Sequence, residues 1–166
     1  MPVVNIIRDV ENLTLTIVAE FAAPPARIWA LYADARQLER VWGPPTYPAT
    51  FVDHDLTPGK RSTYYMTGPE GQKFHGFWVI TDVDQPHSFR FEDGFADADF
   101  NHIQAMPSAR CAYRFEAIPT GTRATYTSTY TALEDLEKVL AMGVEEGATL
   151  AINQIDALLA EVADEA

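Results

Sequence analysis

The sequence predicts a single α+β domain in which an antiparallel sheet packs against a long C-terminal helix. Closely spaced Gly and Pro turn signals divide the chain between residues 49 and 132 into short alternating stretches, a pattern typical of strands joined by hairpins. After residue 132, apolar residues recur at steps of three and four, as in a helix that buries one face. At 166 residues we expect one domain, 1–166, with its core at about 13–162.

The N-terminal part is expected to contain one strand and two short helices. Residues 13–21 alternate between apolar and mostly polar side chains, which indicates a half-buried strand. Two prolines end this strand, and because proline fits the first turn of a helix, we expect a helix over residues 25–32. Asp34 can cap a second helix over residues 35–41, which the following Gly-Pro-Pro stops.

Six further strands are expected between the turns. They span Ala49–Leu56, Arg61–Thr67, Lys73–Asp82, Ser88–Glu92, Ala109–Ile118 and Arg123–Ala132. One connection, residues 93–108, is longer than the usual limit of about 12–15 residues for a loop without structure. We therefore interpret it as a lid or a disordered excursion.

The C-terminal helix is the clearest element in the sequence. Its predicted apolar face consists of Leu136, Leu140, Gly143, Gly147, Ala151, Ile155, Leu158 and Val162. Gly143 and Gly147 lie one turn apart, and glycine costs about 1 kcal/mol relative to alanine inside a helix. Two explanations stay open: a close approach of backbone or ligand to this face, or a tight contact between helix and sheet.

Several short motifs resemble one known family. They are Phe21-x-Ala23-Pro24-x-x-x-Ile28-Trp29, Val41-Trp42-Gly43-Pro44-Pro45, Gly76, Met106-Pro107, Gly121-Thr122-Arg123 and Met142-Gly143-x-Glu145-Glu146-Gly147. In its motifs and order of elements the chain resembles the START/Bet v 1-like (SRPBCC) superfamily. Within it, the chain is similar to the branch named for the C-terminal domain of the heat-shock protein 90 ATPase activator, over about residues 13–159. The resemblance implies the helix-grip fold, in which a curved antiparallel sheet wraps around the C-terminal helix and encloses a cavity.

The composition excludes several classes of partner. With 12 Lys and Arg against 24 Asp and Glu, the net charge is −12, so we expect no binding to nucleic acid or to an anionic membrane. The N-terminus lacks a signal peptide pattern and Cys111 is the one cysteine, which predicts a cytoplasmic protein with a core thiol. We expect no cofactor and no metal site. An apolar side of the last strands would be compatible with a homodimer.

Aromatic side chains are the strongest functional signal, because the strands carry more large rings than one helix face can cover. The candidate ligand-binding residues are Trp42, Tyr64, Met66, Phe74, Trp78, Phe91, Phe95, His102, Met106, Tyr113, Tyr126, Gly143 and Gly147. We expect a protein that holds a small hydrophobic or aromatic molecule in an internal cavity, with residues 93–108 gating entry. An ordinary aromatic core is the structural alternative.

Two other functions are compatible with the sequence. One is a cavity enzyme of the polyketide cyclase/dehydratase or hydrolase type, with Glu145, His102 or a tyrosine as acid or base. The other is an interaction protein similar to a chaperone ATPase activator. For Glu145 itself, we favour a solvated helix face over a buried carboxyl.

Overall fold

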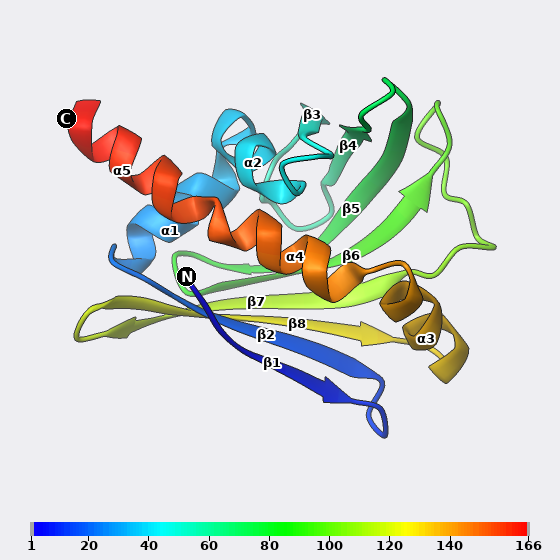
Figure 1. Cartoon of the computed structure of the whole chain (residues 1–166), viewed down its shortest axis with the longest axis horizontal. Coiled ribbons are helices and arrows are strands. Elements are labelled where there is room, and N and C mark those ends of the chain that lie inside the picture. Colours follow the sequence, from blue (N-terminus) through cyan, green and yellow to red (C-terminus); the bar gives the residue numbers. More distant parts are fainter. Residues whose placement is uncertain (1, 166) are drawn as a thin grey trace.

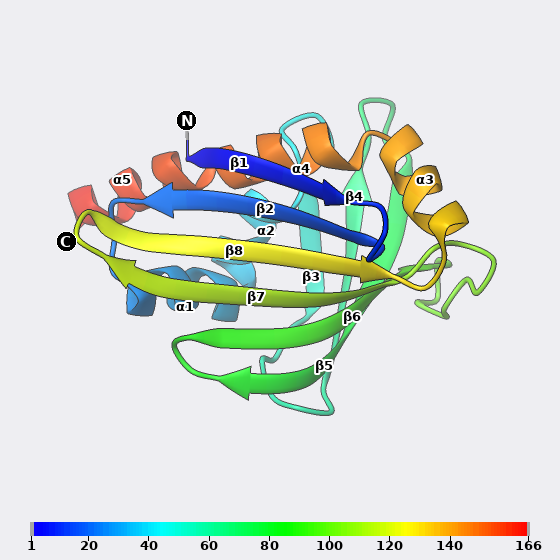
Figure 2. The same cartoon turned by 90° about the horizontal axis from the view of Figure 1, so that it is seen from below.

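The protein is described by a computed structural model of residues 2–165, with side chains placed through residue 161. In this part of the chain, eight strands form one antiparallel sheet in the order β1-β2-β8-β7-β6-β5-β4-β3, and five helices lie on one face of it (Figures 1 and 2). The elements are β1 (Val3–Asp9), β2 (Thr14–Phe21), α1 (Pro25–Ala33), α2 (Ala35–Trp42), β3 (Ala49–Asp53), β4 (Arg61–Thr67), β5 (Lys73–Asp84), β6 (Ser88–Ala96), β7 (Ala109–Ile118), β8 (Gly121–Tyr130), α3 (Leu133–Ala141), α4 (Val144–Asn153) and α5 (Ile155–Glu165). This arrangement confirms the expected α+β helix-grip fold.

The two short helices begin and end as the sequence predicts. Pro25 occupies the first turn of α1, where a missing backbone N–H leaves no hydrogen bond unmade. The carboxylate of Asp34 accepts a hydrogen bond from the backbone N–H of Arg36 (2.9 Å) and so caps α2. At Gly43 a side chain would collide with the backbone of Tyr47, which explains why glycine follows this helix.

Successive side chains of each strand point to opposite faces of the sheet. We call the face that the helices cover the inner face. In β2 the buried residues are Leu15, Ile17, Ala19 and Phe21. Rings from β5 and β6 stack at the centre of this face, with the Trp78 and Phe91 centroids 4.2 Å apart. Most of the aromatic residues therefore fill the core.

Several strand boundaries differ from the sequence-based expectation. The β5 strand continues to Asp84 and not only to Asp82, and β8 spans Gly121–Tyr130 in place of Arg123–Ala132. A strand, β1, precedes the first expected strand and forms an edge of the sheet; its side chains are mostly exposed, so it lacks the alternation that reveals a buried face. The third strand ends at Asp53 and not at Leu56. The β6 strand continues to Ala96 and pairs with His75, so the long connection begins at residue 97.

The C-terminal helical segment is interrupted where a continuous helix was expected from Leu136 to Val162. Gly143 adopts a left-handed conformation (φ 83°) that a helix cannot continue through, so α3 ends before it and α4 begins after it. A second irregularity at Gln154 separates α4 from α5, and the Gln154 side chain donates to the carbonyl oxygen of Gly43 (2.8 Å). This bond ties the helical segment to the end of α2.

Candidate functional site

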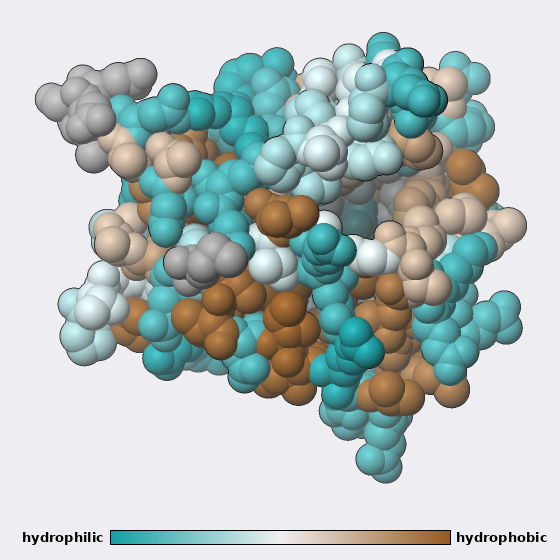
Figure 3. Space-filling model, viewed as in Figure 1, coloured by the Kyte–Doolittle hydropathy of each residue, from teal (hydrophilic) through white to brown (hydrophobic). Residues whose placement is uncertain are grey.

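A cavity of about 100 Å³ lies between the inner face of the sheet and the junction of α3 and α4. Its lining consists of Tyr64, Asp93, Gly94, Phe95, Pro107, Ala109, Tyr130, Val139 and Val144. The helix-bearing face of the molecule is also hollowed between α4 and the neighbouring strands β4 and β5 (Figure 3). The cavity combines apolar side chains with two tyrosines and one carboxyl group.

Strand register places the polar side of this cavity. Asp93 is paired with Trp78 of β5 on one side and with Ala109 of β7 on the other, and Ala109 is paired with Tyr130 of β8. Asp93 has the same parity in β6 as the buried Phe89 and Phe91, so its side chain belongs to the inner face. The small Ala109 between two larger residues leaves space at this level of the sheet.

Tyr64 is the hydrogen-bond partner of Asp93. Its hydroxyl donates to Asp93 Oδ1 at 2.9 Å. The tyrosine ring lies against Gly76, where an added Cβ would be 2.5 Å from Tyr64 Cζ and from Tyr64 Oη. Glycine at 76 therefore creates the slot that holds the Tyr64 ring in position for this hydrogen bond.

The environment of Asp93 shifts its protonation toward neutrality. The side chain keeps some solvent contact, but atoms crowd it on all sides, and burial raises the pKa of Asp93 to about 7. The hydrogen bond from Tyr64 acts in the opposite direction. Burial, and next the Asp93 charge, raise the pKa of Tyr64 well above its usual value. Near neutral pH this pair therefore holds a carboxyl that can gain or lose a proton beside a neutral phenol.

Cys111 lies next to this pair on β7 but does not have the character of a nucleophile. Burial raises the pKa of its thiol, and the nearby Asp93 charge adds to this effect. The sulfur lies 3.7 Å from Ser128 Oγ. These properties agree with the expected core thiol.

The connection 97–108 is a compact loop that touches the cavity near its end. Asp97 accepts hydrogen bonds from the backbone N–H groups of Asp99 and Asn101 (both 2.9 Å), and Arg61 donates to the carbonyl oxygen of Phe100. Pro107 belongs to the cavity lining. Gating of entry to the cavity by this loop stays a prediction.

The structure divides the thirteen predicted ligand-binding residues into four groups. Tyr64 and Phe95 line the cavity. Trp42 packs edge-to-face on Tyr64 with centroids 5.7 Å apart, just behind the wall. The core of the molecule contains Trp78, Phe91 and Tyr126, and the partly buried Tyr113 and Met66 pack against it. The plain aromatic core, which was the alternative to a large pocket, therefore accounts for most of the rings.

The remaining five residues lie away from the cavity. Phe74 is half exposed beside Tyr47, and His102 lies over Phe77 on the outer side of the sheet, with ring centroids 5.0 Å apart. Met106 contacts Lys138 of α3. A Cβ on Gly143 or Gly147 would meet open space, so neither glycine marks a tight contact between helix and sheet.

Sequence reasoning missed Asp93, the one carboxyl in the cavity lining of the described residues. The dipeptide Asp93-Gly94 is a typical turn signal, and it suggested that the strand ends at Glu92. The alternation Phe89, Phe91, Asp93, Phe95 was the available signal, because it places a carboxylate on an apolar strand face.

The proposed enzymatic acid Glu145 lies elsewhere. Its carboxylate pairs with Arg8 of β1, and the hydrogen bond from Arg8 lowers the pKa of Glu145. Neither Glu145 nor His102 belongs to the cavity lining among the described residues. The interpretation of Glu145 as part of a solvated helix face agrees with this position.

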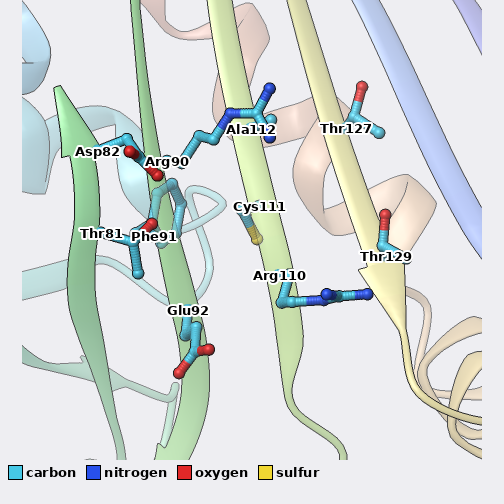
Figure 4. A pocket seen from close by; sticks show the side chains of 10 residues that line it. All are labelled: Thr81, Asp82, Arg90, Phe91, Glu92, Arg110, Cys111, Ala112, Thr127 and Thr129. Atoms are coloured by element: carbon cyan, nitrogen blue, oxygen red, sulfur yellow. The ribbon is translucent and has the colours of Figure 1, made fainter. Parts of the chain in front are cut away.

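Two larger hollows, of about 380 and 660 Å³, lie on the opposite, outer face of the sheet. Figure 4 shows the first, where Asp82, Arg90, Glu92 and Arg110 extend from neighbouring strands beside Thr127 and Thr129. Strand register sets Asp82 opposite Arg90 and Glu92 opposite Arg110, so the charges of this surface compensate one another. We regard it as an ordinary solvated sheet face.

Comparisons with known proteins agree with this architecture. A crystal structure of protein Ms6760 from Mycobacterium smegmatis is 61% identical, with 95% of this chain and 97% of that chain covered and a TM-score of 0.89. A solution structure of a protein from Arthrobacter aurescens is 45% identical, with coverage of 95% and 92% and a TM-score of 0.91. A protein from Rhodobacter sphaeroides, 19% identical over 95% and 98% with a TM-score of 0.81, shares the fold.

The search of curated proteins gives no significant match. Among the residues described, no helix has the length and apolar character needed to cross a membrane. The model of the family described as "Activator of Hsp90 ATPase homolog 1-like protein" matches residues 22–160, which include the strands and helices that build the cavity. The chain therefore belongs to the activator of Hsp90 ATPase homolog 1-like family.

Proposed function

We propose that this protein binds a small, mostly apolar molecule in the cavity between the sheet and the α3–α4 junction. The observation that carries the proposal is the cavity itself: about 100 Å³ with apolar and aromatic walls and the Asp93–Tyr64 pair at one place in its lining. Apolar cavities with a few placed polar groups are the usual form of small-molecule sites.

The volume limits the ligand. An engineered apolar cavity of about 150 Å³ accepts benzene, so this smaller cavity suits a molecule of roughly four to six non-hydrogen atoms, or a group of that size on a longer ligand. This volume favours the smallest members of the class that the sequence predicts, a small hydrophobic or aromatic molecule.

The experiment is a titration of the 15N-labelled protein with a panel of small apolar molecules. Binding is measured from the shifts of the amide resonances. Native mass spectrometry of freshly purified protein would first identify any ligand that remains bound. We expect the largest shifts at Val139 and Val144, which line the cavity on the helix side.

A cavity-filling variant supplies the control. Ala109→Leu adds three carbons inside the cavity, whereas Ala112→Leu makes the same change on the same strand toward the outer face. We expect Ala109→Leu to abolish binding and Ala112→Leu to retain it. Equal binding by both variants would place the ligand elsewhere and contradict the proposal.

A cavity enzyme is a second candidate, favoured by the Asp93 carboxyl. A group with a pKa near 7, hydrogen-bonded to a tyrosine inside a cavity, suits general acid–base catalysis at neutral pH. Turnover of an unsaturated or hydroxylated small molecule that disappears in Asp93→Asn but persists in Asp82→Asn would support it.

A further inference from the structure

We propose that the ligand carries a protonated amine and that this ammonium group binds Asp93. The inference rests on the proposed function and deepens it by naming the chemical class of the ligand. It assigns to the cavity an alkylammonium compound with a short apolar body.

The Asp93 carboxylate has no cationic partner among the described residues. Within the part of the chain that the structure describes, the cavity lining contains no Lys, Arg or His. The Tyr64 hydroxyl donates one neutral hydrogen bond to Oδ1, and the backbone N–H of Gly94 supplies another. A crowded carboxylate without a counter-charge is unfavourable, so a ligand that brings a positive charge gains more from Asp93 than a neutral ligand of the same shape does.

The other walls of the cavity also suit an ammonium group with a short apolar body. Tyr64, Phe95 and Tyr130 contribute aromatic rings to the lining. The faces of aromatic rings carry partial negative charge and attract ammonium groups, most strongly where water is excluded. Val139, Val144 and Pro107 complete the lining with apolar surface suited to a short alkyl body.

Negative charge in the cavity and over the whole chain disfavours an anionic ligand. A carboxylate ligand would place a second negative group beside Asp93, and two adjacent negative charges strongly disfavour binding of the ionised ligand. The net charge of −12 also repels anions and draws cations toward the surface. Both effects select an amine over a fatty acid or another anionic metabolite.

The test compares three probes of matched size: butylamine, 1-butanol and butyrate, titrated into the full-length protein by calorimetry and by amide resonance shifts. At pH 8 we expect butylamine to bind at least tenfold more tightly than butanol, and butyrate not to bind. The affinity for butylamine should rise about tenfold from pH 6 to pH 8, because Asp93 must be deprotonated to bind the ammonium group and the pKa of Asp93 is about 7.

Two variants separate the carboxylate from general charge effects. Asp93→Asn removes the proposed partner, and Asp82→Asn removes an equal charge from the exposed outer face of β5. We expect Asp93→Asn to bind butylamine and butanol equally, whereas Asp82→Asn should retain the preference of the wild-type protein. Circular dichroism checks that both variants fold.

A measurement on the wild-type protein keeps the proposal testable even if Asp93→Asn does not fold. At pH 6.5 much of Asp93 is protonated, so the binding of butylamine should release a fraction of a proton to the buffer. The release is detected by calorimetry, because the heat of binding then depends on the ionisation enthalpy of the buffer. No proton release on binding, or tighter binding of butanol than of butylamine, would overturn the amine assignment while leaving a ligand cavity. Failure of all three probes to bind would count against the amine and also against the proposed cavity function.

Discussion

Asp93 gives the clearest link between a single residue and the behaviour of the protein. Because its pKa is about 7 in the folded state and near 4 in an unfolded chain, ionisation of this carboxyl opposes folding. Its contribution to stability is therefore most favourable below pH 4, decreases as the pH rises, and reaches its least favourable value above about pH 7.

The variant Asp93→Asn should reveal this dependence. Asparagine keeps an oxygen that accepts the Tyr64 hydrogen bond but cannot ionise. Relative to the wild-type protein, we expect the melting temperature of the variant to be higher by several degrees at pH 8, and the gain to shrink or reverse at pH 4. Thermal scans at the two pH values measure it, and an equal difference at both would contradict the raised pKa.

Gly76 and Tyr64 are coupled by contact. The variant Gly76→Ala brings a methyl group to 2.5 Å from the Tyr64 ring, so the ring must move, at a cost of about 1–3 kcal/mol of stability. In the double variant Tyr64→Ala/Gly76→Ala the clash is absent, and the added cost of the Gly76 change should largely vanish. Additive losses in chemical denaturation would mean that the two residues do not compete for this space.

At the level of elements, the two glycines of the C-terminal segment should respond to alanine with opposite signs. Gly147 lies inside α4 with open space around its missing side chain, so Gly147→Ala should stabilise by roughly 1 kcal/mol through helix propensity. Gly143 has a left-handed backbone (φ 83°), so Gly143→Ala should destabilise by about 1 kcal/mol. Denaturant titrations of the two variants check the signs, and the same sign for both would refute this assignment.

The same pair shows what the sequence can and cannot predict about an element. The 3.6-residue periodicity correctly indicated helix on both sides of Gly143, because each side buries an apolar face. The break was not visible, because apolar spacing is insensitive to one residue with a left-handed backbone. Likewise β1 escaped prediction as an exposed edge strand, and Asp93 escaped because Asp-Gly inside a strand has the composition of a turn.

For the whole molecule, the alternation of residues, the turn spacing and the family motifs were sufficient to predict the fold. They were not sufficient to predict the cavity, because its walls come from β4, β6, β7, β8, α3 and α4 and depend on register between strands far apart in the chain. Which rings fill the core and which line the cavity is decided by these contacts. No single segment contains that information.

The excess of acidic residues acts on the whole chain. With 24 Asp and Glu against 12 Lys and Arg, mutual repulsion opposes the compact state, and salt screens it. Ion pairs such as Arg123–Glu20 are exposed and weak, so their loss matters less. We expect the melting temperature at pH 8 to rise by a few degrees between 20 and 200 mM NaCl. A fall would show that the ion pairs outweigh the repulsion.

Apolar side chains along β1 gather at one edge of the molecule, below α4 in the view of Figure 3. They include Val4, Ile6 and Ile7 of β1 and Val10 of the turn that follows it, each at least 38% exposed. Arg8, near the end of the same strand, forms an ion pair with Glu145 in the first turn of α4. A charged residue on an edge strand also hinders sheet-to-sheet pairing between molecules.

The division of the helical segment at Gly143 has a kinetic consequence. The helix before it, α3, is short, and the left-handed backbone of Gly143 separates its hydrogen bonds from those of α4. We therefore expect the amide groups of α3 to exchange with solvent while α4 and the sheet stay folded. Val139 belongs to α3 and Val144 lies just beyond it, one on each side of the division and both on the cavity wall. Deuterium should therefore enter α3 earlier than β7, and an occupant of the cavity should slow its entry there first.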